Sequence, residues 1–304
     1  MLGRGRSRSK ERPYRIYTTD FDEVISSTVL LNQVTPPSGR PAYEAAIDTF
    51  RGPSAFRQTL ERTIRSMDGV AGLRDCHFTF LVDHSGSMKG PHALAAAVIV
   101  DVVTAYFAER SVTYEVLGYT TRNWRGGRAR ARWRRRLCLP NPPGRVCEIR
   151  HIVYGDDRSD PNWRDGLGLL FAADVLREGI DGEALRWAEA RLGDGDRSQR
   201  ILVQIGDCSP SDAATDQANP KLFLENDFLA TAVRLTGRSD LTFGVLSFVP
   251  WVVDGFRQFR LRDEALDRAA DVVASLTMLA TGQNPPPITT LFAQGSTDGS
   301  SSHR

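Results

Sequence analysis

Five short, continuously apolar runs alternate with longer helical patterns along most of the chain. The runs are predicted strands, at residues 76–82, 112–119, 150–154, 200–206 and 241–249. The helical patterns cover residues 91–110, 165–177, 181–192, 222–235 and 263–282, the last with Gly282 as a C-cap. A strand that is apolar on both faces belongs inside a sheet covered on both sides. The alternation therefore predicts an α/β fold, with a doubly wound, mostly parallel sheet and helices on both faces.

Composition divides the 304 residues into four predicted parts. They are a basic disordered tail (1–12), a helical lead-in (13–70), the α/β domain with an arginine-rich insertion at 121–145 (71–282), and a second disordered tail (283–304). The lead-in has helical spacing from residue 41 in two pieces that break at Gly52-Pro53. We expect the sheet and the chemistry to lie in the α/β domain.

The charge and the cysteines limit the function classes. The 39 basic and 37 acidic residues leave a net charge of +2, so an argument for nucleic-acid binding must rest on local clustering. The four cysteines have no C-x-x-C spacing and follow no secretory signal, which predicts reduced thiols. We see no run of about 20 apolar residues that would span a membrane. These features predict a cytoplasmic protein without a membrane segment.

Oxygen-bearing side chains follow two of the predicted strands. Asp83, Ser85 and Ser87 come directly after the first strand, and Asp207 follows the strand at 200–206. Ligands bind at the carboxyl ends of strands in such sheets, where these side chains would meet. Carboxylates and hydroxyls are hard oxygen donors, which suit Mg²⁺ or Mn²⁺ better than Zn²⁺. In the alternative interpretation, Asp83 or Ser85 caps the following helix and the hydroxyls bond only to the turn backbone.

Catalytic motifs do not explain the same stretch. DHSGS lacks the first glycine of the G-x-S-x-G elbow, and no stretch has the spacing of a P-loop. Cys208 stands beside Asp207 with no identifiable base near it in sequence, so we interpret it as structural. We therefore expect no catalytic residue on this chain.

The pattern D-x-S-G-S after a strand, with a second Asp after a later strand, resembles the metal-ion-dependent adhesion site of von Willebrand factor A (VWA) domains. Four further segments narrow the resemblance to the C-terminal domain of the CobT subunit of aerobic cobaltochelatase. They are EVLGYTTRNWRGG, NPPGRVCEIRHIVY, EGIDGEALRWAEARL and RILVQIGDCSPSD, and YRIYTTDFDEV resembles a segment upstream of that domain. The resemblance covers most of the chain and implies a Rossmann-like VWA fold.

The resemblance implies an accessory role in an ATP-dependent metal chelatase. In that family the subunit pairs with a AAA+ ATPase, and ATP hydrolysis drives cobalt insertion into a corrin by a large third subunit. The family's ligand positions match Asp83, Ser85, Ser87 and Asp207 here, which implies a Mg²⁺ or Mn²⁺ site. The role of this metal site would be to dock the AAA+ ATPase.

The family's fifth ligand is a threonine after the third strand, and this chain departs from the pattern there. The corresponding loop reads GDDRSDPNW and contains no threonine. Ser159 is the first candidate for the missing hydroxyl, and Thr120 or Thr121 are candidates at another strand end. A metal-dependent protein- or RNA-binding VWA module unrelated to cobalamin is the alternative function.

The arginine-rich insertion at 121–145 carries Trp124 and Trp133 among its arginines. Arginine with interleaved aromatic residues is the chemistry of phosphate contact and base stacking. Three interpretations stay open: a loop that docks an acidic partner, a solvated loop, and an RNA-binding segment. Salt-dependent binding to RNA would separate them.

Overall fold

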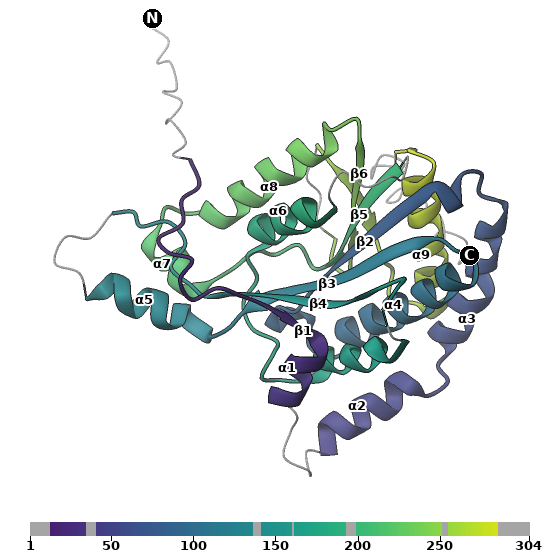
Figure 1. Ribbon diagram of the computed structural model, residues 1–304, viewed down its shortest axis with the longest axis horizontal. Helices are drawn as coiled ribbons and strands as arrows, with labels where there is room; N and C mark the ends of the chain where they lie inside the picture. The colour runs from purple at the N-terminus through teal and green to yellow at the C-terminus, as the bar shows by residue number, and fades with distance from the viewer. Residues whose placement is uncertain are drawn as a thin grey trace, which may run out of the picture.

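A mixed, mostly parallel sheet forms the centre of the molecule (Figure 1). The computed structural model describes residues 13–34, 41–135, 141–159, 161–192, 199–250 and 255–284. Within these ranges the sheet has seven strands in the order β1-β4-β3-β2-β5-β6-β7. They are β1 (Glu23–Ser26), β2 (Cys76–Asp83), β3 (Thr113–Thr121), β4 (Ile149–Asp156), β5 (Gln199–Gly206), β6 (Leu241–Ser247) and β7 (Arg257–Arg260). β4 is antiparallel to β3 and parallel to β1, so these two strands run opposite to the other five.

Helices cover both faces of the sheet, as the sequence predicts. One face packs against α3 (Ala55–Thr63), α4 (Pro91–Glu109), α9 (Ala265–Ala280) and the 3₁₀ segment η5 (Pro161–Phe171), and the other against α6 (Asp181–Leu192) and α8 (Phe223–Thr236) (Figure 1). The remaining α-helices are α1 (Ser27–Val34), α2 (Pro41–Arg51), α5 (Gly127–Arg134) and α7 (Ala213–Ala218). The architecture is the doubly wound, mostly parallel α/β sheet that the sequence predicts.

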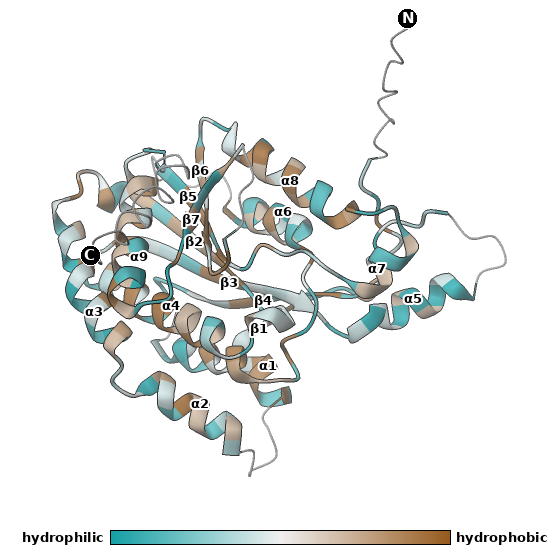
Figure 2. Cartoon of the chain, turned by 180° about the vertical axis from the view of Figure 1, so that it is seen from behind, coloured by the Kyte–Doolittle hydropathy of each residue, from teal (hydrophilic) through white to brown (hydrophobic). Residues whose placement is uncertain are grey.

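α4 is a core helix. Its length and composition would fit a membrane span, but 67% of the apolar stretch is buried inside the fold. Apolar residues recur along the strands and α4, whereas α5 is mostly hydrophilic (Figure 2). Burial against the sheet therefore accounts for the apolar character of α4.

All five predicted strands are present, and the predicted helices are confirmed except at residues 165–177. That segment instead forms η5 and then an irregular stretch. Gly166 and Gly168 explain the difference, since a Cβ on Gly166 would lie 2.5 Å from the Ser27 hydroxyl and one on Gly168 2.7 Å from the Tyr43 hydroxyl. The chain passes too close to α1 and α2 there for ordinary side chains. Gly282 has φ of +70° just past α9, as expected for a helix-terminating glycine.

The lead-in contributes to the sheet and the core. β1 pairs with β4 at the sheet edge, and α2 and α3 are separated at Gly52-Pro53 as predicted. Leu30 and Leu60 are fully buried in the main hydrophobic cluster. The tails predicted at 1–12 and 283–304 lie outside the described residues, except for residues 283 and 284.

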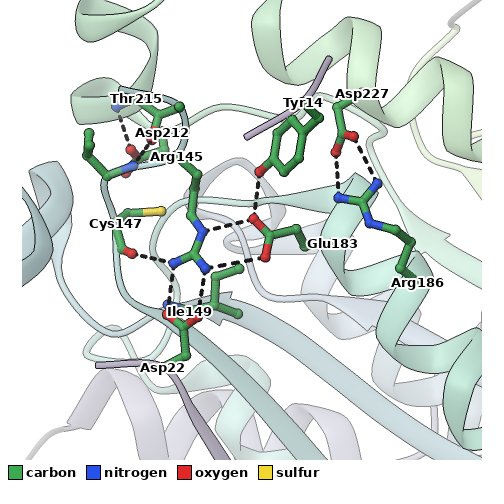
Figure 3. Close-up of polar contacts among 12 residues, drawn as sticks. Tyr14, Asp22, Arg145, Cys147, Ile149, Glu183, Arg186, Asp212, Thr215 and Asp227 are labelled. Atoms are coloured by element: carbon green, nitrogen blue, oxygen red, sulfur yellow. Dashed lines mark hydrogen bonds and ion pairs between the residues drawn. The ribbon is translucent and has the colours of Figure 1, made fainter. Parts of the chain in front are cut away.

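A buried arginine ties the start of the chain to the domain (Figure 3). Arg145 is fully buried, and its Nη2 lies 2.6 Å from Asp22 Oδ2 while its Nε lies 2.8 Å from Glu183 Oε1. Tyr14 donates its hydroxyl hydrogen to Glu183 over 2.6 Å. Asp22 also accepts a hydrogen bond of 2.9 Å from the backbone of Ile149. We call Tyr14, Asp22, Arg145 and Glu183 the arginine clasp; it joins the lead-in to β4 and α6.

The arginine-rich run is partly helical, as α5, and several of its arginines have partners in the fold. Arg128 pairs with the fully buried Glu148, and Arg132 pairs with Asp20. Arg122 lies 3.1 Å from Glu23, and Arg130 donates to Gln217 over 2.7 Å. Residues 136–140 of the predicted insertion lie outside the described residues. Part of the local positive charge is therefore neutralised within the molecule.

Candidate functional site

The carboxyl ends of the central strands meet at one edge of the sheet. β2 pairs in parallel with β3 on one side and with β5 on the other. The chain runs from β2 outward to β3 and β4 and then returns to β5 on the other side of β2, so the strand order reverses between β2 and β5. Such a switch point leaves a crevice where ligands bind in open α/β sheets. The loop from β2 to α4 starts at this crevice and contains Asp83, Ser85 and Ser87.

Asp83 organises the loop that follows β2. It is 1% exposed, and one carboxylate oxygen accepts a 2.7 Å hydrogen bond from the Ser85 backbone while the other accepts a 2.9 Å bond from the Ser85 hydroxyl. The hydroxyls of Ser85 and Ser87 lie 2.9 Å apart. A Cβ on Gly206 would lie 2.7 Å from the Asp83 Cβ, so glycine is needed for β5 to pass this close.

The helix-capping alternative is wrong for α4. Its N-cap residue is Gly90, and no side chain caps the helix. Ser85 precedes the 3₁₀ turn η3 (Gly86–Met88) without a side-chain capping bond. The two serine hydroxyls are thus held by a carboxylate and by each other.

Two further carboxyls lie close to Asp83. Asp207 follows β5 and is 4% exposed, and Asp181 opens α6 and is 1% exposed. Asp181 accepts hydrogen bonds from the Tyr119 hydroxyl over 2.8 Å and from the Gln204 amide over 2.7 Å. Asp181 was not among the predicted site residues, although it lies in the segment EGIDGEALRWAEARL. We call Asp83, Asp181, Asp207, Ser85 and Ser87 the acidic cluster.

The three carboxyls of the acidic cluster interact electrostatically. Burial raises the pKa of Asp83 well above its ordinary value, and the charges of Asp181 and Asp207 raise it further. Burial raises the pKa of Asp181 to about 6, with Asp207 contributing. No basic side chain among the described residues forms an ion pair with any of the three. Buried carboxylates without a cationic partner are unfavourable, so the cluster favours protonation or a bound cation.

The donor set fits a hard divalent cation only if hydroxyls are included. Among the described residues, no three His, Cys, Asp or Glu side chains are arranged to hold a metal ion by themselves. Adding Ser85 and Ser87 supplies the neutral oxygen donors that Mg²⁺ and Mn²⁺ accept beside carboxylates. The chemistry of the acidic cluster is therefore compatible with such an ion.

Ser159 does not lie at the acidic cluster. β4 is antiparallel to β3, so Asp156 at the end of β4 pairs with Glu115 near the start of β3. The loop after β4 therefore lies at the end of the sheet opposite to the carboxyl ends of β2, β3 and β5. The Ser159 hydroxyl donates to Asp156 over 2.8 Å. The prediction that Ser159 supplies the fifth ligand is therefore wrong.

Thr120 and Thr121 lie at the correct edge but hold the neighbouring loops. The Thr120 hydroxyl lies 3.1 Å from the His84 carbonyl and 3.2 Å from that of Val175. The Thr121 hydroxyl donates to the Asn123 carbonyl over 3.1 Å and accepts a 3.3 Å bond from the Glu178 backbone. Both hydroxyls connect the ends of β3 to the segments around the crevice.

A pocket of about 510 Å³ opens over the acidic cluster. Its lining includes Ser85, Ser87, Lys89, Trp124, Arg177 and Ser209. Ser87 and Lys89 are exposed, and Trp124 is 50% exposed. The serine hydroxyls are therefore reachable from solvent, whereas the carboxyls lie beneath them.

Glu178 holds one wall of this pocket in place. It is 8% exposed, and its two carboxylate oxygens accept backbone hydrogen bonds from Arg125 over 2.9 Å and from Ala213 over 2.8 Å. Burial and a hydrogen bond with Asp212 raise the pKa of Glu178 to about 7. The side chain thus connects the Trp124 loop to the start of α7.

We expect Glu178→Gln to lower the free energy of unfolding by about 1–3 kcal/mol, because one of the two backbone N–H groups would face an amide NH₂ group. Urea unfolding measures the change, and hydrogen exchange should become faster at Arg125 and Ala213. Glu109→Gln is the control, since the Glu109 side chain is 74% exposed and should change stability by less than about 0.5 kcal/mol. Equal stability of the two variants would contradict the role given to Glu178.

Comparison with protein families identifies the domain that carries the acidic cluster. The family model described as "Cobalamin biosynthesis protein CobT VWA domain" matches residues 67–251, more than half of the chain. The match contains all of β2 to β6 and every residue of the acidic cluster. The chain belongs to the CobT family, and the matched residues are its VWA domain, which implies a role in the chelatase of cobalamin biosynthesis.

Proposed function

We propose that this chain is a non-catalytic subunit of a cytoplasmic, cobaltochelatase-type complex. Its VWA domain docks a AAA+ ATPase through a divalent cation, Mg²⁺ or Mn²⁺, held at the acidic cluster. ATP hydrolysis by the partner then drives cobalt insertion into a corrin on a large third subunit. Membership of the CobT family supports this assignment over other uses of the fold.

The observation that carries the proposal is three buried carboxyls beneath two serine hydroxyls at the floor of an open pocket. Asp83, Ser85, Ser87 and Asp207 would hold the ion, and Asp181 would add negative charge behind them. A bound divalent ion supplies an electrophilic contact for a carboxylate of the docking partner. The residues of the chain itself position the serine hydroxyls and neutralise part of the charge of the ion.

The alternative is a metal-dependent protein- or RNA-binding module unrelated to cobalamin. RNA binding would rest on α5 and its flanking arginines. Arg122, Arg128, Arg130 and Arg132 already contact groups of the molecule itself, which reduces the charge available to phosphates. The internal contacts therefore favour the chelatase role.

Asp83→Ala tests the proposal. In Mg²⁺, the wild-type protein should bind the AAA+ ATPase of the same chelatase, and Asp83→Ala should weaken that binding by about 100-fold or more, as expected when about 3 kcal/mol is lost. The variant should stay folded, because removing Asp83 relieves repulsion with Asp181 and Asp207. Titration calorimetry with Mg²⁺ and biolayer interferometry with the ATPase measure the two affinities.

Asp157→Ala is the matched control. Asp157 is exposed just after β4, at the edge of the sheet away from the acidic cluster. It should bind Mg²⁺ and the ATPase as the wild type does. ATPase binding that is unaffected by Asp83→Ala or by EDTA would remove the cation from the proposed mechanism.

A further inference from the structure

The pocket over the acidic cluster has a basic side that the cluster does not use. Arg177 lines the pocket, and its Nε is buried without a hydrogen-bond partner among the described residues. Burial lowers the pKa of this guanidinium, and the negative charges of Asp174 and Glu178 oppose that shift only in part. Arg177 therefore has an unused N–H donor in the wall of the pocket.

The backbone fixes Arg177 beside the loop that carries the serines. Its N–H donates to the His84 carbonyl over 3.0 Å, and its carbonyl accepts a 2.5 Å bond from the Gly86 N–H. These two bonds form a short parallel bridge with Ser85. The side chain of Arg177 therefore starts from a position that is set relative to Ser85 and Ser87.

Trp124 also lines the pocket and is half exposed. A Cβ on Gly86 would lie 3.0 Å from the nearest carbon of the Trp124 ring, so the indole packs directly on the serine loop. Glu178 holds the next residue, Arg125, through its backbone. The pocket thus presents a flat aromatic surface next to an unused guanidinium.

The arrangement of charge selects the ligand. Ser85 and Ser87 separate the pocket from the buried carboxyls of the acidic cluster. Arg177 and the exposed Lys89 line the pocket directly, together with Glu178, whose two carboxylate oxygens are already bonded to backbone N–H groups. A carboxylate approaching the floor is repelled until a cation neutralises it, but one approaching Arg177 is attracted in either state. A ligand with two acidic groups can therefore use both regions once the cation is bound.

We propose that Arg177 and Trp124 form a second anchoring subsite for the docking partner, one that binds a further carboxylate of the same acidic segment. The first carboxylate lies at Ser85 and Ser87, and the second pairs with the Arg177 guanidinium while the segment packs on the indole. This inference rests on the proposed function because it uses the same pocket. It identifies the partner chemistry as a protein segment with two closely spaced acidic side chains.

Arg177→Gln and Trp124→Ala test the subsite in the full-length chain. In Mg²⁺, Arg177→Gln should weaken binding of the AAA+ ATPase by about tenfold to a hundredfold, the usual effect of losing a charge-assisted hydrogen bond. Its affinity for Mg²⁺ alone should not fall, since Arg177 is not among the proposed ligands. The binding should also depend less on salt than in the wild type.

Arg177→Lys and Trp124→Phe distinguish a loss of the subsite from a folding defect. Each keeps the charge or the aromatic ring, so each should retain more ATPase affinity than Arg177→Gln or Trp124→Ala. Arg158→Gln is the matched charge control, because Arg158 is exposed near the end of β4 at the opposite sheet edge. It should bind the ATPase with wild-type affinity.

The results separate this inference from the proposed function. If Asp83→Ala abolishes ATPase binding while Arg177→Gln and Trp124→Ala bind as the wild type does, the second subsite is wrong and the cation-dependent docking stands. If Arg177→Gln weakens binding while EDTA has no effect, the second subsite is supported and the cation-dependent docking is wrong. If the wild type does not bind the ATPase in Mg²⁺, both are wrong.

Discussion

Replacing Arg145 with Met is expected to lower the free energy of unfolding by about 3–5 kcal/mol, the usual effect of removing one partner of a buried ion pair. Arg145 is fully buried, and the side chains of Asp22 and Glu183 are only 23% and 11% exposed. Without the guanidinium, both carboxylates would stay largely desolvated with no cation between them. Met fills a similar volume, so the loss reports mainly on charge and hydrogen bonding.

The part of the fold that Arg145→Met destabilises can be located, in addition to measuring the loss in free energy of unfolding. Arg145 connects Asp22, in the lead-in, to Glu183 on α6, so its removal should release the start of the chain before the rest of the fold opens. Urea unfolding monitored by circular dichroism gives the free energy. Hydrogen exchange should become faster over β1 in particular, since β1 lies at the sheet edge.

Arg51→Met is the matched control for Arg145→Met. Arg51 pairs with Asp165 over 2.9 Å, but both side chains are 63% exposed. An exposed pair contributes about 0–1 kcal/mol, so this variant should unfold close to the wild-type midpoint. An Arg145→Met variant whose free energy of unfolding lies within about 1 kcal/mol of the wild type would show that the arginine clasp does not stabilise the fold.

The strands of the central sheet could be predicted because each is apolar on both faces. A run such as 200–206 must be covered on two sides, and this requirement is local in sequence. β1 and β7 were missed because each has only four residues and includes charged side chains at a sheet edge. Short edge strands depend on pairing with a neighbour that the local pattern does not reveal.

Strand direction explains the error at Ser159. An apolar run has the same pattern in either direction, so RHIVY predicted a strand but not that β4 would be antiparallel to β3. The resemblance assigned the fifth ligand to the loop after this strand, which would reach the acidic cluster only if β4 were parallel to β3. The observed direction places that loop at the opposite edge, with Ser159 bound to Asp156.

Asp181 shows why part of the acidic cluster was not predicted. An acidic residue in the first turn of a helix commonly interacts with the helix dipole, so its position in the sequence suggested no further role. Its proximity to Asp83 depends on how α6 packs against the end of β3, where Tyr119 donates to it. Likewise, the arginine run reads as exposed charge until Glu148 and Asp20 are seen beside α5.

Removing divalent cations is expected to make stability fall as pH rises from about 4 to about 7. Asp181 has its pKa raised from 3.8 to about 6 in the folded protein, and the pKa of Asp83 is raised as well. The folded state then holds protons more tightly than the unfolded state between these values, so the free energy of unfolding decreases with increasing pH there. A tenfold change in proton affinity corresponds to about 1.4 kcal/mol, so Asp181 alone contributes on the order of 3 kcal/mol.

Mg²⁺ should reverse this loss above pH 6. An ion that binds only the folded protein stabilises it in proportion to the logarithm of its concentration, and it does so most strongly when the carboxyls have lost their protons. Urea unfolding at several pH values, in EDTA and in Mg²⁺, gives two curves that should meet near pH 4 and separate by several kcal/mol at pH 7.

The difference in free energy of unfolding between EDTA and Mg²⁺ reports on the acidic cluster and not on other buried carboxyls. Burial also raises the pKa of Asp216 to about 6, but this group has no part in the proposed ion site and lowers both curves equally. Asp216→Asn should therefore shift the curves together, whereas Asp83→Ala should remove the separation between them. Curves in EDTA and Mg²⁺ that coincide from pH 5 to pH 8 would mean that the buried carboxyls bind no cation, and that a proton is what compensates their charge.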